Sequence, residues 1–145
     1  MKFFKLIISS VLLTSVVVTS ACTSHIPPEI KLAPENAPGV AEVRKQAENY
    51  LSRTVRWGGA IIETDNREQA SRLTVIALPL SDEGKPQNSD HSPGRFIAII
   101  DDFLEPQLYS QNRHITVTGK ILKTETQKVG EYLYEYPVVQ VDHYY

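Results

Sequence analysis

The stretch HITVTGKILKT, residues 114–124, decides the fold class of this 145-residue chain. Small or apolar residues alternate in it with mostly polar ones: Ile115, Val117, Gly119 and Ile121 against His114, Thr116, Thr118 and Lys120. Because successive side chains of a β-strand point to opposite sides, this two-residue period predicts a strand with one buried face.

Four further segments have the composition of strands. They are Thr54–Thr64, Arg72–Leu80, Arg95–Ile100 and Glu131–His143. Gly58 and Gly59 predict a bulge or a close approach of another backbone inside the first. Gly130 predicts a hairpin turn before the last. In that last strand the apolar face changes parity at Pro137, from tyrosines to valines, which predicts an edge position or a bulge.

Two short helices complete the pattern. Residues Val40–Leu51 have an apolar stripe at helical spacing. Pro106 at a helix start predicts one turn over Pro106–Ser110, with Leu104, Leu108 and Tyr109 packed inward. Five strands with a helix between the third and fourth are typical of an OB-fold. We therefore expect an all-β chain with short helices, a five-stranded OB-fold-like barrel preceded by an N-terminal helix. A sheet that meanders without closing is the alternative.

The amino terminus predicts export. Lys2 and Lys5 precede an uncharged run over Leu6–Val18, and small residues follow, as in a secretory signal peptide. The run is shorter than the roughly 20 apolar residues that span a bilayer as a helix. Ser20-Ala21-Cys22 resembles the lipobox of bacterial lipoproteins. That resemblance implies cleavage between Ala21 and Cys22, then S-diacylglycerol and N-acyl groups on Cys22. A plain membrane-anchor helix and a buried thiol are the alternatives.

The predicted organisation is a signal peptide over 1–21, a lipidated cysteine with a Pro-rich tether over 22–39, and one domain over 40–145. Four prolines lie between residues 23 and 39, so we expect an extended tether that reaches about 40–50 Å from the lipid. Removal of Lys2 and Lys5 with the signal peptide changes the formal net charge from −2 to −4. This acidic balance argues against nucleic acid as a partner.

Aromatic and basic residues supply a candidate binding surface. Tyr132, Tyr134 and Tyr136 fall on one face of the last strand and, with Trp57, could stack on sugars or bases. Arg56 and Arg95 could bind carboxylates in a bidentate manner. The alternative is that the aromatic residues pair across strands or fill the barrel, and that the arginines pair with nearby acids.

The sequence predicts neither catalytic residues nor a metal site or cofactor. The histidines His25, His91, His114 and His143 lack zinc-ligand spacing. Asp101, Asp102 and Glu105 could act as an acid–base pair, but a loop and a helix start explain them better. No nucleophile elbow and no glycine-rich phosphate loop is present in the sequence. We therefore expect a protein that is not an enzyme.

Several short motifs, in order, resemble the Slp (starvation-induced) outer-membrane lipoproteins of Gram-negative bacteria. They are Val55–Gly59, Leu78–Leu80, Gly84–Pro86, Gly94–Phe96, Phe103–Pro106, Tyr109, Thr116–Gly119 and Tyr134–Val139. No single motif is specific, whereas their order and spacing, together with the lipobox, are.

The resemblance implies an outer-membrane lipoprotein of starvation or stationary-phase stress with a Slp-type barrel domain. It is anchored on the periplasmic face through Cys22 and has no catalytic residues to transfer. The expected partners are membrane lipid and an envelope protein or the cell wall. A periplasmic binding module for an oligosaccharide or peptide is the alternative function.

Overall fold

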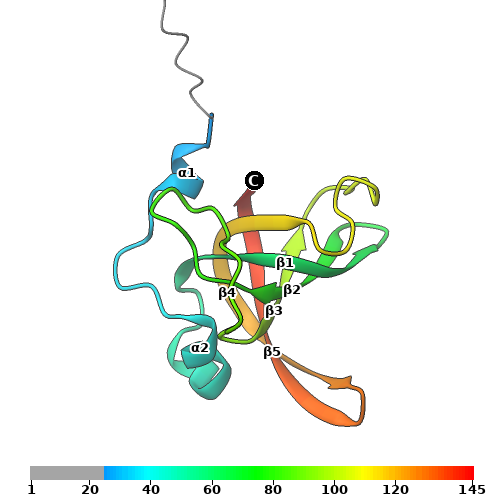
Figure 1. Ribbon diagram of the computed structural model, residues 1–145. Helices are drawn as coiled ribbons and strands as arrows, with labels where there is room; N and C mark the ends of the chain where they lie inside the picture. Colours follow the sequence, from blue (N-terminus) through cyan, green and yellow to red (C-terminus); the bar gives the residue numbers. More distant parts are fainter. Residues whose placement is uncertain (1–24) are drawn as a thin grey trace, which may run out of the picture.

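All five predicted strands are present in the computed structural model of the protein, which describes residues 25–145 (Figure 1). The strands are β1 (Thr54–Asn66), β2 (Ser71–Ala77), β3 (Arg95–Ile100), β4 (His114–Val129) and β5 (Tyr132–Tyr144). The second ends at Ala77, earlier than predicted, and Leu80 instead bridges to Pro86 within the following loop. The fourth runs five residues further than predicted and meets the fifth at a turn that contains Gly130, as the sequence indicated.

The sheet closes into a ring in the order β1-β2-β3-β5-β4. Neighbouring strands are antiparallel except β3 and β5, which pair in parallel from Ile97 opposite Val138 to Ile99 opposite Gln140. That parallel contact closes the ring. The expected all-β character with short helices is therefore confirmed.

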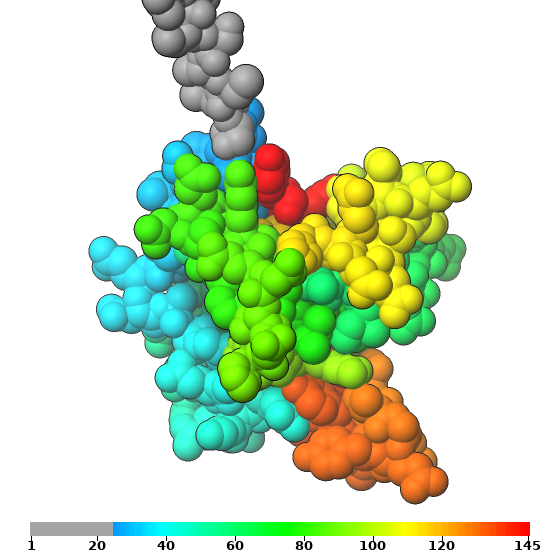
Figure 2. Space-filling view, viewed as in Figure 1, coloured from blue at the N-terminus to red at the C-terminus, as the bar shows by residue number. Residues whose placement is uncertain are grey.

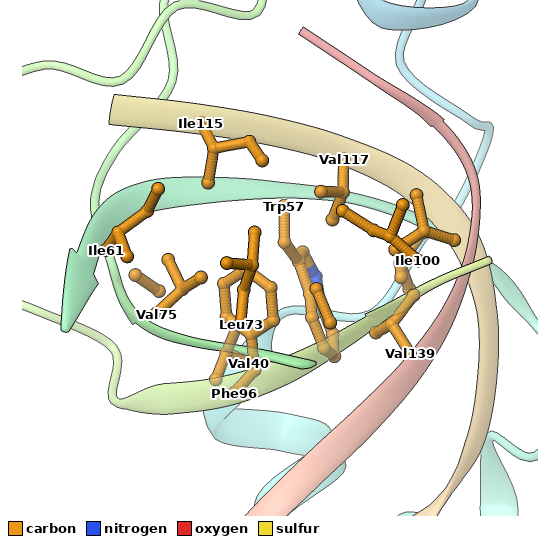
Figure 3. Close-up of a cluster of buried hydrophobic side chains, with 14 of the residues drawn as sticks. Val40, Trp57, Ile61, Leu73, Val75, Phe96, Ile100, Ile115, Val117 and Val139 are labelled. Carbon is orange, nitrogen blue, oxygen red and sulfur yellow. The ribbon is translucent and has the colours of Figure 1, made fainter. Parts of the chain in front are cut away.

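The predicted strand faces account for the core. Ile115, Val117 and Ile121 of β4 are buried inside the ring, as their alternation predicts. Thr116 and Thr118 of the opposite face are buried too, so the prediction of a single buried face was wrong for this part of β4. Figure 3 shows side chains from all five strands and from Val40, at the start of helix α2 (Val40–Gln46), meeting inside the ring. The largest members of this cluster are Trp57, Phe96, Ile61, Leu73, Ile100, Leu104, Ile115 and Ile121.

Two glycines allow backbones to come close where the ring bends. A Cβ on Gly59 would lie 1.9 Å from the carbonyl oxygen of Ile76, and one on Gly119 would lie 2.1 Å from that of Gln140. The predicted close approach in β1 is confirmed, while the irregularity in its pairing lies slightly further along, between Ile61 and Glu63.

Pro137 lies just before β5 begins to pair with β3 at Val138. On this side Pro137 has no partner strand, so its missing N–H interrupts no ladder of backbone hydrogen bonds. The bulge beside it belongs to the partner strand, between Ile121 and Lys123 of β4. The change in apolar parity has a simple cause: Val139 and Val141 face the ring interior, whereas Tyr136 and Val138 join a second apolar cluster with Ile97.

The predicted helix exists but is shorter. Helix α2 spans Val40–Gln46, and a 3₁₀ turn, η1, covers Ala47–Asn49. The backbone N–H of Gly39 donates to the Glu42 carboxylate at 2.9 Å, which satisfies one free donor at the helix start. Val40 and Val43 are buried in the main core.

The chain over Phe103–Asn112 makes one turn, in which the Glu105 carbonyl accepts hydrogen bonds from the N–H groups of Leu108 and Tyr109. Leu104 is buried, but Leu108 is 61% exposed, so the prediction that Leu108 packs inward was wrong. Its neighbour Tyr109 is partly buried against Tyr144.

The described part of the Pro-rich segment is not an extended tether. Residues Pro28–Lys31 form helix α1, and Ile26 and Ile30 are buried. Side chains of β1 hold the segment through its carbonyl groups. Trp57 Nε1 donates to Pro38 at 3.0 Å, and Arg56 donates to Ile30 and Lys31 at 3.0 and 2.7 Å. The expected reach of 40–50 Å is therefore wrong, because this segment is folded onto the domain.

The molecule has two distinct ends (Figures 1 and 2). Helix α1, residue Tyr145 and the Phe103–Asn112 loop lie at one, which we call the α1 end. Helix α2 and the turn between β4 and β5 lie at the other, the α2 end. Contacts connect the members of the α1 end: Thr116 bonds Gly84 and Tyr145, Gly84 lies against Ile30, and Tyr109 of the loop packs against Tyr144.

Candidate functional site

A row of three tyrosines follows one face of β5. The ring centroids of Tyr132 and Tyr134 are 6.4 Å apart, and those of Tyr134 and Tyr136 are 4.8 Å apart. Exposure falls along the row, from 64% at Tyr132 to 3% at Tyr136. Tyr136 fills the second apolar cluster with Ile97 and Val138. Only the first two tyrosines therefore contribute to a surface.

The middle tyrosine connects three elements. The guanidinium carbon of Arg44, on α2, lies 3.9 Å from the centre of the Tyr134 ring, within cation–π range. The Tyr134 hydroxyl accepts a hydrogen bond from the backbone N–H of Arg95 at 2.8 Å. Gly94 has a φ of +126°, and a Cβ there would lie 2.6 Å from this hydroxyl, so glycine is required for the approach.

Sequence reasoning missed Arg44. It lies beside the predicted apolar stripe of its helix, and nothing local marks it as the partner of a tyrosine in β5. The contact depends on how α2 packs against the sheet, so no pattern in the sequence could have indicated it.

Trp57 does not belong to the surface, which corrects the prediction. It is 6% exposed and packs edge-on against Phe96 with centroids 5.4 Å apart. The reason lies in its register: Trp57 shares the inward face of β1 with Val55 and Ile61, and its N–H is satisfied by Pro38. The expected alternative, that the aromatic residues fill the ring, is correct for Trp57, whereas Tyr136 is buried in the second apolar cluster.

The side chain of Arg56 is used inside the fold, whereas carboxylate binding by the side chain of Arg95 stays a prediction. Arg56 donates to the last carbonyls of α1, where a cation also complements the helix dipole. Arg95 contributes its backbone N–H to Tyr134, and its side chain is half-buried. The six residues predicted as one surface are thus divided between the core, the α1 contact and the tyrosine row.

A polar groove lies beside the tyrosine row at the α2 end. Its volume is about 460 Å³. Helix α2 and η1 form one wall and the β4–β5 hairpin the other; the lining residues are Arg44, Lys45, Gln46, Ala47, Glu48, Asn49, Thr124 and Glu135. Within residues 25–145, neither Arg44 nor Lys45 takes part in an ion pair. The polar groups that line this groove suit a ligand with hydroxyl or carboxylate groups.

The carboxylates considered for acid–base work are exposed and serve the loop. Asp102 accepts a hydrogen bond from the N–H of Phe103 at 2.8 Å and lies 3.4 Å from the Tyr144 hydroxyl. Burial, followed by the nearby Tyr109 and Asp102, raises the pKa of Tyr144. In the described part of the chain, no group of three or more His, Cys, Asp or Glu side chains is placed to hold a metal ion.

The predicted lipidation site, Cys22, and the cleavage position after Ala21 lie outside the described residues. From residue 25 onward, none of the helices combines the length and the apolar character that crossing a membrane requires.

The sequence model of the outer membrane lipoprotein Slp family matches residues 19–145. The chain belongs to this family. The resemblance on which the sequence analysis depended is therefore confirmed over most of the chain, and the matched range includes Cys22.

Two relatives place this Slp-family chain among bacterial proteins. An "uncharacterized protein" of Haemophilus influenzae is 40% identical over 104 residues, 71% of this chain and 56% of the relative. The "uncharacterized lipoprotein YeaY" of Escherichia coli is 28% identical over 132 residues, 90% of this chain and 67% of the relative. The match thus spans little more than half the length of the Haemophilus relative. No solved structure matches the chain.

Proposed function

We propose that the protein is a non-catalytic outer-membrane lipoprotein, anchored by acylated Cys22, that supports the envelope during starvation or stationary phase. Family membership over residues 19–145 carries this proposal. The signal-like segment before Cys22 and the description of the Escherichia coli relative as a lipoprotein support it further. The domain faces the periplasm in this proposal.

The chemistry of the anchor requires a cysteine. A thiolate is a good nucleophile and can accept a diacylglycerol group. One acyl chain binds membranes only marginally, so stable anchoring needs the additional chains of a lipoprotein. The proposed partners are the lipid leaflet and an envelope protein or the cell wall, with no role for nucleic acid.

The fold within this proposal is an OB-fold. The strand order β1-β2-β3-β5-β4, with one parallel contact between β3 and β5, supports that interpretation. In place of a helix between the third and fourth strands, the chain has the single turn after Glu105.

Metabolic labelling tests the anchor. Cells that express the full chain are grown with labelled palmitate, and Cys22→Ser is compared with the neighbouring Ser24→Ala as control. We expect label in the parent and in Ser24→Ala, in the outer-membrane fraction, and none in Cys22→Ser. Retention of label by Cys22→Ser would overturn the anchor. The stress role predicts that a deletion strain survives stationary phase less well than its parent strain, while the two strains do not differ during exponential growth.

A second candidate function, a periplasmic binding module for an oligosaccharide or peptide, is favoured by the groove at the α2 end. Arg44 and Lys45, which line the groove, supply donors without ion-pair partners among residues 25–145. The test is a thermal-shift series with cell-wall saccharides and peptides, using the mature chain and Arg44→Gln/Lys45→Gln. A ligand at 100 times its Kd adds about 2.7 kcal/mol to the free energy of unfolding. No shift with any of them would count against the module.

A further inference from the structure

Large apolar side chains are exposed at both ends of the molecule. At the α1 end, Phe103 is 66% and Leu108 61% exposed. At the α2 end, Tyr132 is 64% and Leu133 63% exposed. Exposure alone therefore does not distinguish an end that contacts lipid from one that faces water.

The attachment of the chain makes the distinction. Only Thr23 and Ser24 stand between Cys22 and His25, where the described structure begins. This connection spans at most roughly 10 Å. The following residues are fixed to the domain, since Ile26 and Ile30 are buried and Arg56 bonds the end of α1. A lipid on Cys22 would thus hold the α1 end close to the membrane surface.

The loop that carries Phe103 and Leu108 is held in position by the residues around them. The Asn66 side chain donates to the carbonyl of Leu104 at 2.8 Å and accepts from its N–H at 3.2 Å. Thr64 donates to the carbonyl of Tyr109 at 2.6 Å. Because the buried Leu104 anchors the loop, little conformational entropy remains to be lost when its exposed side chains enter another phase.

We propose that Phe103 and Leu108 insert into the interfacial region of the lipid leaflet to which Cys22 is attached. This inference rests on the proposed acylation of Cys22. Transfer of each apolar side chain out of water lowers the free energy. Because the acyl anchor already holds the loop close to the surface, insertion loses little further translational entropy. Asp101 and Asp102 immediately precede the loop and Glu105 lies within it, so the contact is apolar and does not depend on anionic lipid.

This orientation has a consequence for the rest of the molecule. The groove between α2 and the β4–β5 hairpin lies at the α2 end and faces away from the lipid. Any soluble or cell-wall ligand would then reach Arg44 and Lys45 without competition from the membrane.

Quenching by brominated lipid tests the proposal. Phe103→Trp and Tyr132→Trp are made in the full chain, and the mature lipidated proteins are reconstituted into phosphatidylcholine vesicles with plain or dibrominated acyl chains. The two positions are matched, since both are aromatic and about two-thirds exposed. Trp57, buried in the core of the parent, provides the baseline. We expect the added tryptophan at 103 to be quenched several-fold more than that at 132.

Equal quenching at the two positions, or stronger quenching at 132, would overturn the proposal. Palmitate labelling of the same preparations separates its failure from that of the anchor. Labelled protein without preferential quenching at 103 refutes the insertion and leaves the lipoprotein intact. Unlabelled protein refutes both.

Discussion

The guanidinium of Arg72 and the carboxylate of Glu125 lie 2.9 Å apart, although β2 and β4 are not neighbours in the closed sheet. The two side chains are only 14% and 28% exposed. Strands β2 and β4 both pair with β1, and the long side chains of Arg72 and Glu125 bridge the distance between them. The ion pair thus connects two strands that share no backbone hydrogen bonds.

A double-mutant cycle measures the coupling of this pair. We expect Arg72→Met and Glu125→Gln each to lower the free energy of unfolding by about 1–2 kcal/mol, because each leaves a partly buried polar group without its partner. The coupling energy should be about 1 kcal/mol by urea denaturation. The control is the exposed pair Arg67–Asp65, at 2.8 Å, whose coupling should be only a few tenths of a kcal/mol. Equal couplings would contradict the argument from burial.

The pH dependence of stability should reveal the same carboxylate. Burial raises the pKa of Glu125, but hydrogen bonds from Gln127 and Arg72 and the charges of Arg72 and Lys123 outweigh it and hold the pKa below the ordinary 4.5. The stabilisation by ionised Glu125 is therefore complete above about pH 4.5 and is lost as pH falls through the folded-state pKa. The difference in unfolding free energy between parent and Glu125→Gln should shrink over this range in acid. If the difference in unfolding free energy grew in acid instead, the pKa of Glu125 would be raised in the folded protein and not lowered.

Substitution of Gly59 tests the closeness of β1 to β2. A Cβ would lie 1.9 Å from the backbone oxygen of Ile76, and backbone does not move aside cheaply. We expect Gly59→Ala to destabilise the protein by more than about 3 kcal/mol or to prevent folding. Gly39→Ala is the control, because its Cβ meets only a Glu42 carboxylate oxygen at 4.0 Å. A thermal melt of Gly59→Ala like that of the parent would refute the geometry.

The buried position of Trp57 predicts its fluorescence and its contribution to stability. The indole should emit at short wavelength and resist acrylamide quenching in the folded protein. Trp57→Phe keeps the contact with Phe96 but removes the hydrogen bond to Pro38, so we expect a loss of about 1–3 kcal/mol. Tyr132→Phe, at an exposed position, should change stability by less than about 0.5 kcal/mol. Red-shifted emission that acrylamide quenches readily would show that Trp57 is exposed and would contradict its buried position.

The candidate site could be predicted only in part. The parity of β5 was enough to place Tyr132 and Tyr134 on one face, and the structure keeps them there. The same pattern did not distinguish Tyr136, because its burial depends on Ile97 of β3, some forty residues earlier in the chain. Arg44 was missed for the same reason, since its partner lies on a strand near the other end of the sequence.

The sequence by itself determined the strands, the hairpin at Gly130, the start of α2 and the resemblance of the amino terminus to a lipoprotein signal peptide. Each of these depends on residues that are neighbours in the chain. Tertiary structure alone decided that the Pro-rich segment folds onto the domain. Its four-residue helix α1 has little stability alone, but Arg53, Arg56 and Trp57, 17 to 26 residues away in sequence, donate to carbonyl groups along the segment. Long-range contacts of this kind arise only when the ring closes, and they hold the segment from Ile26 to Pro38 against the domain.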